Sequence, residues 1–340
     1  MKRALFIGGT GTISTAITAL LASGGEWDLT LLNRGNRRAG IPAGVRLIQA
    51  DISDEADAAR KLADQEDWDC VCDVIGFVPA QVERDWRLFH GHTKQYIYIS
   101  SASAYQKPPR SPHITEETPL VNPFWEYSRN KAACEAFLME KYTKEGFPVT
   151  IVRPSHTYGD WSVPVGVHGD KGSWQVLQRM LDGKPVIIHG DGLSQWTLTH
   201  NTDFARGFVG LMGNPAAIGE AVQITSDETL TWNQIYSQVA DALGVELKPY
   251  HVASEFLDAA GPYDFRGSLL GDKACTVLFD NSKLKRLVPG FRAEVPFAQG
   301  VRRTVRHILS HPELQVPDPA FDAWCDRVIS ALEQAKGSLL

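Results

Sequence analysis

The sequence predicts an α/β fold, in which a doubly wound parallel sheet is joined to a smaller second domain. Short apolar runs alternate with amphipathic stretches through the first half, which is the pattern of the strand-helix units that build a parallel sheet. A glycine-rich turn, residues 8–11, follows the first apolar run. Beyond residue 155 the segments become shorter and denser in glycine, proline and aromatic residues, which indicates a different and smaller unit.

The alternating half, residues 1–155, supplies the elements of the expected sheet domain. We expect strands near 3–8, 27–33, 45–50, 68–75, 94–100 and 148–153, separated by helices near 11–23, 54–65, 79–90 and 125–144. Asp54 and Pro79 stand at the starts of two of these helices, where a capping carboxylate and a first-turn proline are common.

Residues 156–340 are expected to form mainly a substrate-binding lid over the sheet domain. Its elements should include strands near 185–188 and 221–224 and helices near 201–213, 231–243 and 296–310. No long linker separates the two halves, so we expect later segments such as 186–225 to rejoin the sheet domain. Interleaved parts of this kind share a cleft.

The composition bounds the function classes. With 43% hydrophobic residues, 22% charged residues and a net charge of −6, the chain has the make-up of a soluble, mildly acidic protein, which disfavours a general nucleic-acid binder. The apolar run 4–8 is too short for a signal-peptide core or a membrane span, so we expect a cytoplasmic protein without a membrane partner.

No metal site is expected. The five cysteines are scattered and lack Cys-x-x-Cys spacing, which favours buried reduced thiols: Cys70, Cys72, Cys134, Cys275 and Cys325. A second set of possible ligands also lacks a recognisable metal spacing: His168, Asp170, His189 and His200.

The glycine-rich turn is typical of a dinucleotide site in a Rossmann-like sheet. Gly8 and Gly11 allow the tight turn and let the backbone approach a pyrophosphate, and the amides of Thr12 and Ile13 at the helix start face that anion. A plain turn is the alternative, although the preceding strand and following helix favour the nucleotide site. Ser14 takes a position where glycine or alanine is usual, and it is small enough to fit.

Other strand ends extend this site. The second strand ends in Asn33 and Arg34, where an NAD-specific site would place an acid, so NADP is favoured over NAD, with a solvated basic loop as the alternative. Arg37 or Arg38 could assist Arg34. Later positions are expected against the adenine or beneath the cofactor: Asp51, Ile52, Gly76 and Phe77.

The expected strand near 94–100 runs into Ser100, Ser101 and Ser103, and Tyr127 and Lys131 follow on an expected helix. Residues four apart share a helix face, so the ammonium can favour the ionised phenol and let it exchange a proton with a hydroxyl or carbonyl. A solvated helix face is the alternative for the pair alone, but its position after the nucleotide pattern indicates a hydride-transfer site.

At these positions the chain resembles the extended short-chain dehydrogenase/reductases, the nucleotide-sugar epimerase/dehydratase group. The resemblance covers nearly the whole chain and rests on the order and spacing of its motifs: the glycine turn, Asp51-Ile52, Ser100-Ser101-Ala102-Ser103, Tyr127-Ser128-Arg129-Asn130-Lys131, residues 153–159, Gly190-Asp191-Gly192 and His200-Asn201-Thr202-Asp203.

The resemblance implies residue roles. Ser101, with Ser103 as the alternative, would hydrogen-bond the reacting oxygen, Tyr127 would be the acid/base, and Lys131 would orient the nicotinamide ribose and lower the pKa of the tyrosine. Pro154 and His156 would lie beside the cofactor. A homodimer through the helices near 79–90 and 125–144 is also implied by the resemblance.

Departures from the family pattern bear on the substrate. Ala102 and Ser103 replace the acidic pair of the sugar dehydratases, which disfavours 4,6-dehydration. Trp196 stands near the position of an arginine that clamps a diphosphate, and it either stacks on a sugar or packs in the core. Other side chains are candidates for substrate or phosphate contacts: His156, His168, Arg266, Asp272, Lys273 and Arg292.

The sequence thus predicts an NADP- or NAD-dependent oxidoreductase or epimerase that acts on a hydroxyl or keto group of a sugar or nucleotide sugar. The alternative is a non-catalytic member of the same fold, either a cofactor sensor or an RNA-binding relative of the chloroplast stem-loop type. The acidic net charge and the intact set Ser101, Tyr127 and Lys131 argue against that alternative.

Overall fold

A seven-stranded parallel sheet forms the frame of the N-terminal half, as expected from the sequence, in the order β12-β7-β5-β4-β1-β2-β3. The computed structural model describes residues 1–35 and 40–339. The strands are β1 (Lys2–Ile7), β2 (Trp27–Asn33), β3 (Arg46–Gln49), β4 (Cys70–Asp73), β5 (Tyr96–Ile99), β7 (Val149–Pro154) and β12 (Ala221–Ile224).

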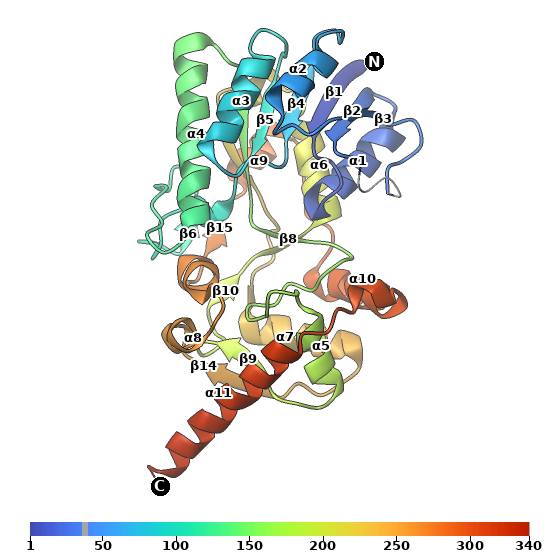
Figure 1. Ribbon diagram of the computed structural model, residues 1–340. Helices are drawn as coiled ribbons and strands as arrows, with labels where there is room; N and C mark the ends of the chain where they lie inside the picture. Colours follow the sequence, from blue (N-terminus) through green and yellow to red (C-terminus); the bar gives the residue numbers. More distant parts are fainter. Residues whose placement is uncertain (36–39, 340) are drawn as a thin grey trace.

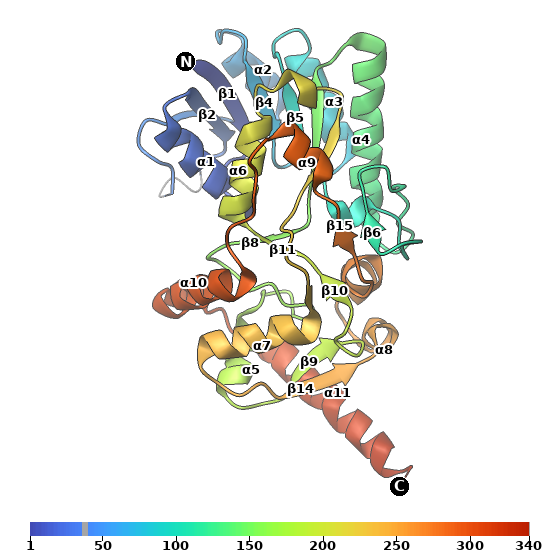
Figure 2. The same ribbon diagram turned by 180° about the vertical axis from the view of Figure 1, so that it is seen from behind.

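Helices cover both faces of this sheet (Figure 1, Figure 2). Alternate side chains of β1 enter two different cores: Ala4 and Phe6 pack on one side, and Leu5 and Ile7 pack on the other. The first side is covered by α1 (Thr12–Gly24) and α6 (Asn201–Leu211), and the second by α2 (Glu55–Leu62), α3 (Pro79–Phe89) and α4 (Glu126–Glu145). A sheet buried on both faces explains why its strands read as continuous apolar runs.

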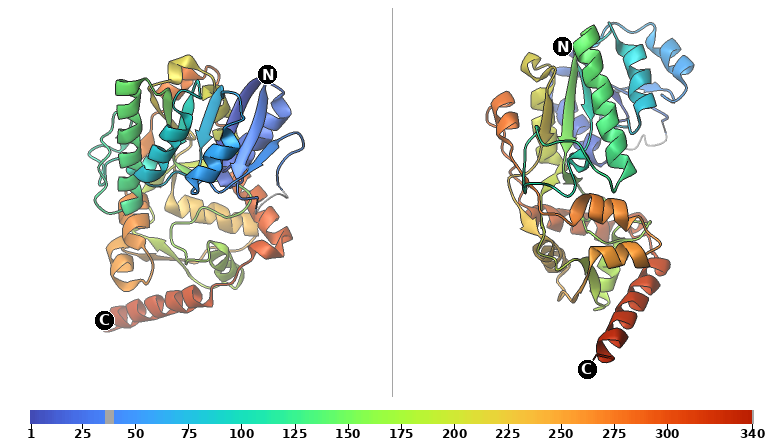
Figure 3. Two further views of the ribbon diagram at one scale, coloured as in Figure 1. Left: turned by 45° about the horizontal axis from the view of Figure 1, so that its top comes forward. Right: turned by 90° about the vertical axis from the view of Figure 1, so that its left-hand side faces the viewer.

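The second half builds a separate core from short paired strands and helices. Its elements are α5 (Trp174–Leu181), β9 (Val186–His189), β10 (Gln195–Trp196), β13 (Leu230–Thr231), α7 (Trp232–Leu243), β14 (Pro249–Val252), α8 (Ser254–Ala260), the π-helical segment Arg266–Lys273, α10 (Phe297–Ser310), the short 3-10 turn Pro312–Leu314 and α11 (Pro319–Gly337). The side view of Figure 3 shows these elements below the sheet, with α11 running outward to the C-terminus.

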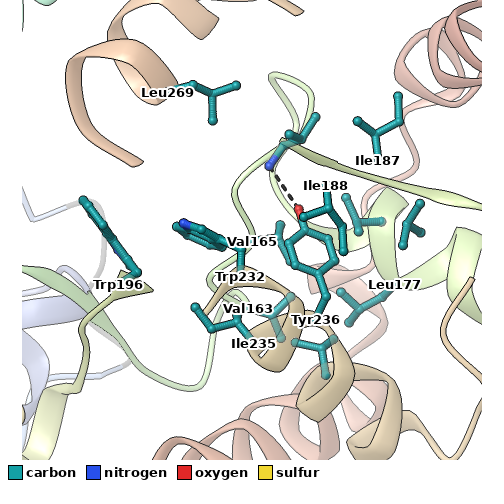
Figure 4. Packing of buried hydrophobic residues seen from close by; sticks show 14 of the residues in the cluster. Val163, Val165, Leu177, Ile187, Ile188, Trp196, Trp232, Ile235, Tyr236 and Leu269 are labelled. Atoms are coloured by element: carbon teal, nitrogen blue, oxygen red, sulfur yellow. Dashed lines mark hydrogen bonds between the residues drawn. The ribbon is translucent and has the colours of Figure 1, made fainter. Parts of the chain in front are cut away.

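The segment 186–225 divides between the two halves. Its later part, α6 and β12, lies with the central sheet. Its first strand, β9, differs from our expectation, because it pairs with β14 and not with the sheet. The cause is side-chain burial, since Ile187 and Ile188 of β9 pack in the core of the second half (Figure 4).

Short elements join the halves. Strand β8 (His156–Tyr158) pairs in parallel with β11 (Leu198–His200), and Figure 2 shows both between the sheet and the second half. Strand β6 (His113–Ile114) pairs with β15 (Leu278–Phe279), which precedes α9 (Ser282–Leu287). Over residues 1–35 and 40–339, no helix has the length and apolar character needed to cross a membrane.

Candidate active site

A cavity of about 1100 Å³ lies along the carboxyl ends of the parallel strands, where ligands of open α/β sheets bind. The ends of the strands and the segments just beyond them line it: residues 8–14 at β1, 33–35 at β2, 50–53 at β3, 74, 75 and 77 at β4, 99–103 at β5 and 154–157 at β7. The second half contributes Trp196, Asp272, Lys273 and Phe279. The cavity therefore spans the junction of the two halves.

The glycine turn is shaped for close approach by a ligand. Gly8 and Gly9 have φ angles of 106° and 95°, which side-chain-bearing residues rarely adopt. A Cβ atom on Gly9 would lie 2.6 Å from Cδ2 of Leu31. Gly11 caps α1, and its own N–H donates to Ser14 Oγ at 2.9 Å. Because first-turn amides have no partner within a helix, those of Thr12 and Ile13 can bind an anion such as a pyrophosphate.

The neighbouring region carries charged side chains of both signs. Asn33, Arg34, Asp51 and Ile52 all line the cavity. Hydrogen bonds from Ser53, together with the charges of Arg34 and Arg84, hold the pKa of Asp51 below its usual value. Two arginines thus face one carboxylate here. Arg37 and Arg38, also considered from the sequence, lie outside the described residues.

Arg84 is a lining residue that the sequence did not reveal. Its side chain is buried on α3, and its Nε and NH2 donate to Asp85 Oδ1 at 2.8 and 2.6 Å. In the sequence, the one sign of this role for Arg84 is the adjacent Arg84-Asp85 pair within an amphipathic helix.

Gly76 and Phe77 are both predicted to lie beneath the cofactor, but only Phe77 lines the cavity. Phe77 lines the cavity, and its ring centroid lies 6.3 Å from that of Tyr127. Gly76 does not line it. The Gly76 carbonyl instead accepts hydrogen bonds from Lys131 Nζ at 2.7 Å and from the Tyr98 hydroxyl at 3.0 Å. A side chain on Gly76 would collide with the carboxylate of Asp73, which explains the glycine at this position. Gly76 bears on the site through its carbonyl, which holds Lys131.

The hydroxyl groups predicted for chemistry come together on one wall of the cavity. Ser101 Oγ lies 2.9 Å from Ser103 Oγ, and Ser103 Oγ accepts a hydrogen bond from Ser128 Oγ at 2.8 Å. Tyr127, at the start of α4, hydrogen-bonds to Ser101. The structure thus favours Ser101 over Ser103 as the partner of Tyr127, because Ser103 is held by Ser128 and faces Ser101.

Lys131 lies one turn beyond Tyr127 on α4. Its ammonium donates to Gly76 O and to Ile99 O, each at 2.7 Å, and lies 5.8 Å from the centroid of the Tyr127 ring. Burial lowers the pKa of Lys131 from 10.5 to about 8. The backbone therefore fixes this ammonium between the end of β5 and the Phe77 loop.

The pKa of Tyr127 differs from the sequence prediction. We expected Lys131 to lower it, but burial raises the pKa of Tyr127, and the hydrogen bond with Ser101 opposes this rise only in part. The two backbone carbonyls hold the ammonium 5.8 Å from the ring centroid, and burial of the phenol is the dominant influence on its pKa. In this state Tyr127 is a protonated phenol and a proton donor.

Of the two histidines predicted near the substrate, one lines the cavity and the other does not. His156 lines the cavity, and burial lowers its pKa to about 3, so the ring is neutral and can only share hydrogen bonds. His168 does not line the cavity; its Nδ1 lies 2.8 Å from the carbonyl oxygen of Gly169. Pro154, predicted beside the cofactor, does line it.

Trp196 lines the cavity but belongs mainly to the second core. It is 3% exposed and stacks on Trp232 with ring centroids 5.9 Å apart and an interplanar angle of 30° (Figure 4). The two arginines considered as substitutes for a diphosphate clamp do not line the cavity: Arg266 pairs with Asp258 at 3.5 Å, and the Arg292 carbonyl accepts from Arg206.

Lys107 and Trp125 are two of the further lining residues that the sequence did not reveal. Lys107 lies six residues after Ser101, and the Trp125 ring packs at a tilt of 46° against Tyr127, with centroids 4.9 Å apart. Neither type has a distinctive spacing, although both lie close in sequence to the predicted hydroxyl and phenol. Within the described part of the chain, no three His, Cys, Asp or Glu side chains gather as metal ligands would.

A model of the NAD-dependent epimerase/dehydratase family matches residues 4–225. The chain belongs to this family. The match spans the glycine turn, the serine-rich strand end and the Tyr127-Lys131 pair, so the family assignment made from the motifs is confirmed.

Individual relatives differ in activity. A 2′-dehydrokanamycin reductase of Streptomyces kanamyceticus is 27% identical over 290 residues, which cover 85% of this chain and 80% of the relative. The chloroplast stem-loop binding protein of 41 kDa b of Arabidopsis thaliana is 27% identical over 259 residues, which cover 72% of this chain and 64% of the relative.

The fold is also that of known structures. The dTDP-glucose 4,6-dehydratase of Bacillus anthracis, solved in complex with NAD, superimposes with a TM-score of 0.74 at 18% identity, covering 92% of this chain and 98% of that one.

Proposed function

We propose that this protein is an NAD(P)-dependent enzyme that oxidises, reduces or epimerises a hydroxyl or keto group of a sugar or nucleotide sugar. The convergence of Ser101, Tyr127 and Lys131 on the wall of a cavity whose other end is a glycine turn carries the proposal. Family membership supports the same reaction class.

The nicotinamide cofactor supplies hydride donation or acceptance when it is bound. The chain supplies the proton: Tyr127 Oη donates it to a carbonyl oxygen during reduction and takes it back from a hydroxyl during oxidation. Ser101 Oγ hydrogen-bonds the same substrate oxygen and fixes its place beside the phenol. The Lys131 ammonium, held by the carbonyls of Gly76 and Ile99 at 5.8 Å from the centroid of the Tyr127 ring, would orient the nicotinamide ribose. Neutral His156 completes the wall as a hydrogen-bonding group.

NADP is the proposed cofactor in preference to NAD. Arg34 and Arg84 both line the cavity here, with Asp51 as the lining carboxylate. Arg84 already pairs with Asp85, so Arg34 is the cation proposed for a 2′-phosphate. A guanidinium group pairs well with a 2′-phosphate. Fluorescence titration should give tighter binding of NADPH than of NADH, and Arg34→Ala should narrow the difference by about 1–3 kcal/mol. Equal affinities in the wild type would contradict the preference.

Dehydration is not part of the proposal. Ala102 and Ser103 follow Ser101 in the 3-10 turn Ala102–Ala104, and neither can serve as a carboxylic acid or carboxylate base. Ser103 is further engaged by Ser101 and Ser128.

A homodimer through the outer faces of α3 and α4 is proposed on the family resemblance. The two helices lie side by side at the edge of the molecule (Figure 1). Ala133 and Ala136 on α4 are exposed and small enough for close helix contact. Sedimentation should give a dimer that Ala136→Arg dissociates; a monomeric wild type would contradict it.

One experiment distinguishes the proposed enzyme from the non-catalytic alternative, an RNA-binding or cofactor-sensing protein. NADPH is added to the protein, its fluorescence is followed, and keto-sugars and nucleotide sugars are then screened for consumption of NADPH. The proposal expects binding and turnover that Tyr127→Phe abolishes. Binding without turnover of any sugar would favour a sensor, and absence of NADPH binding would contradict the proposal altogether.

A further inference from the structure

Two lysines lie at the substrate end of the cavity and have no place in the proton-transfer scheme. Lys107 and Lys273 both line the cavity, and both are buried, with 4% and 9% of their surfaces exposed. Buried ammonium groups are rare unless a partner compensates the charge. Their surroundings therefore indicate what the cavity is built to bind.

The Lys107 ammonium is only partly satisfied. It donates to the carbonyl oxygen of Asp272 at 3.1 Å and lies 5.4 Å from the centroid of the Trp196 ring. An ammonium group has three protons to donate, and among the described residues this carbonyl is the one oxygen that accepts from it. Burial lowers the pKa of Lys107, and a nearby negative charge would offset that loss.

Lys273 is fixed beside it by the backbone. It ends the π-helical segment Arg266–Lys273, and such segments are rare and occur often at functional sites. The Lys273 carbonyl accepts from Trp232 Nε1 at 3.1 Å, and its Nζ donates to Ser268 O at 3.2 Å. Asn122 ties this segment to the catalytic strand end by donating to Gly271 O at 2.7 Å and to Ser103 O at 2.8 Å.

The charge balance at this end is positive. The carboxylate of Asp272 lies 3.5 Å from Lys273 Nζ and also acts on Lys107, so one carboxylate faces two ammonium groups. His156 is neutral and adds no charge. Trp196 supports Lys107 with the face of its ring.

We propose that Lys107, assisted by Lys273, is a specificity-determining residue that binds an oxyanion of the substrate, a carboxylate or a phosphate. This inference rests on the proposed function, because it assigns a substrate class to the same cavity. It also separates this chain from its relative named for dehydrokanamycin, since an aminoglycoside carries several ammonium groups that two buried lysines would repel.

Binding of four sugars that share one ring tests the inference. Isothermal titration of NADPH-saturated protein would compare glucuronate and glucose 1-phosphate with neutral glucose and cationic glucosamine. We expect at least one oxyanion sugar to bind tenfold or more tightly than glucose, as a charge-assisted hydrogen bond provides, and glucosamine to bind most weakly. The preferred oxyanion sugar distinguishes a carboxylate from a phosphate site.

Variants assign the preference to Lys107. Lys107→Met should remove the oxyanion preference, Lys107→Arg should retain part of it, and Lys273→Met should reduce it. Lys248→Met is the matched control, because Lys248 is exposed, lies outside the cavity and likewise donates to one carbonyl, that of Gly183 at 2.9 Å. NADPH affinity should be unchanged in all four variants.

The inference is overturned if glucose or glucosamine binds as tightly as both oxyanion sugars, if neither oxyanion sugar binds, or if folded Lys107→Met keeps the preference. Failure of the enzyme proposal looks different, since it would appear as absent NADPH binding or absent turnover in the wild type. An active enzyme without oxyanion preference would refute only this inference.

Discussion

Replacing Lys131 by methionine separates a functional role of this residue from a structural one. The Lys131 ammonium is buried on α4 and is held by the carbonyls of Gly76 and Ile99. Methionine fills a similar volume without the charge. We expect Lys131→Met to impair both turnover and cofactor affinity, because one ammonium serves Tyr127 and the cofactor site.

The buried charge also sets a pH dependence of stability. Burial lowers the pKa of Lys131 from 10.5 to about 8, so the unfolded chain binds this proton more tightly than the folded chain does. Below pH 8 the charged form of Lys131 therefore lowers the free energy of unfolding by about 3 kcal/mol. This destabilisation disappears as the pH rises toward 10.5. Between pH 7 and 10 the wild type should regain roughly 2–3 kcal/mol from Lys131.

Urea unfolding at several pH values from 7 to 10 measures this effect. The difference in unfolding free energy between wild type and Lys131→Met should change by roughly 2–3 kcal/mol in favour of the wild type as pH rises. Lys144→Met is the control, because Lys144 is an exposed lysine of the same helix paired with Glu140, and it should show no such rise. A difference that stays constant over the whole pH range would refute a buried, charged Lys131.

Three further outcomes follow from the geometry. Gly9→Ala should weaken NADPH binding and destabilise the fold by about 1–3 kcal/mol because of its φ of 95° and the nearby Leu31, whereas Gly24→Ala, with open space around it, should do neither in titration and unfolding experiments. Trp196→Ala should lower the unfolding free energy by about 3–5 kcal/mol, since the ring packs on Trp232; a change in substrate affinity without loss of stability would contradict this. Product analysis with nucleotide sugars should detect no 4-keto-6-deoxy sugar, and its detection would require an acid/base pair beside Ser101.

The sheet and the glycine turn were predictable because their signals are local. Runs such as 3–8 and 148–153 are mainly apolar on both faces, so their strand character follows from a few residues, whereas their register comes from the structure. The order of the serine-rich strand end, Tyr127 and Lys131 likewise placed these residues in one cavity, because the segments that follow parallel strands meet at one edge.

The features that the sequence did not predict depend on contacts between segments that lie far apart in the chain. The pairing of β9 with β14 and the stacking of Trp196 on Trp232 are decided by the second core, which no local pattern specifies. Lys107 lies in an irregular segment and meets Asp272 across 165 positions of sequence. The pKa of Tyr127 could not be predicted either, since it reflects burial by the surrounding elements.

Turnover by Tyr127→Phe tests the central claim most directly. The substitution removes the phenolic proton and leaves the glycine turn, Lys131 and the packing against Trp125 in place. With a keto-sugar that the wild type reduces, we expect NADPH affinity to stay within a few-fold and the rate of NADPH consumption to fall by roughly two orders of magnitude or more. A wild-type rate in the folded, NADPH-binding variant would contradict the assignment of Tyr127 as the proton donor.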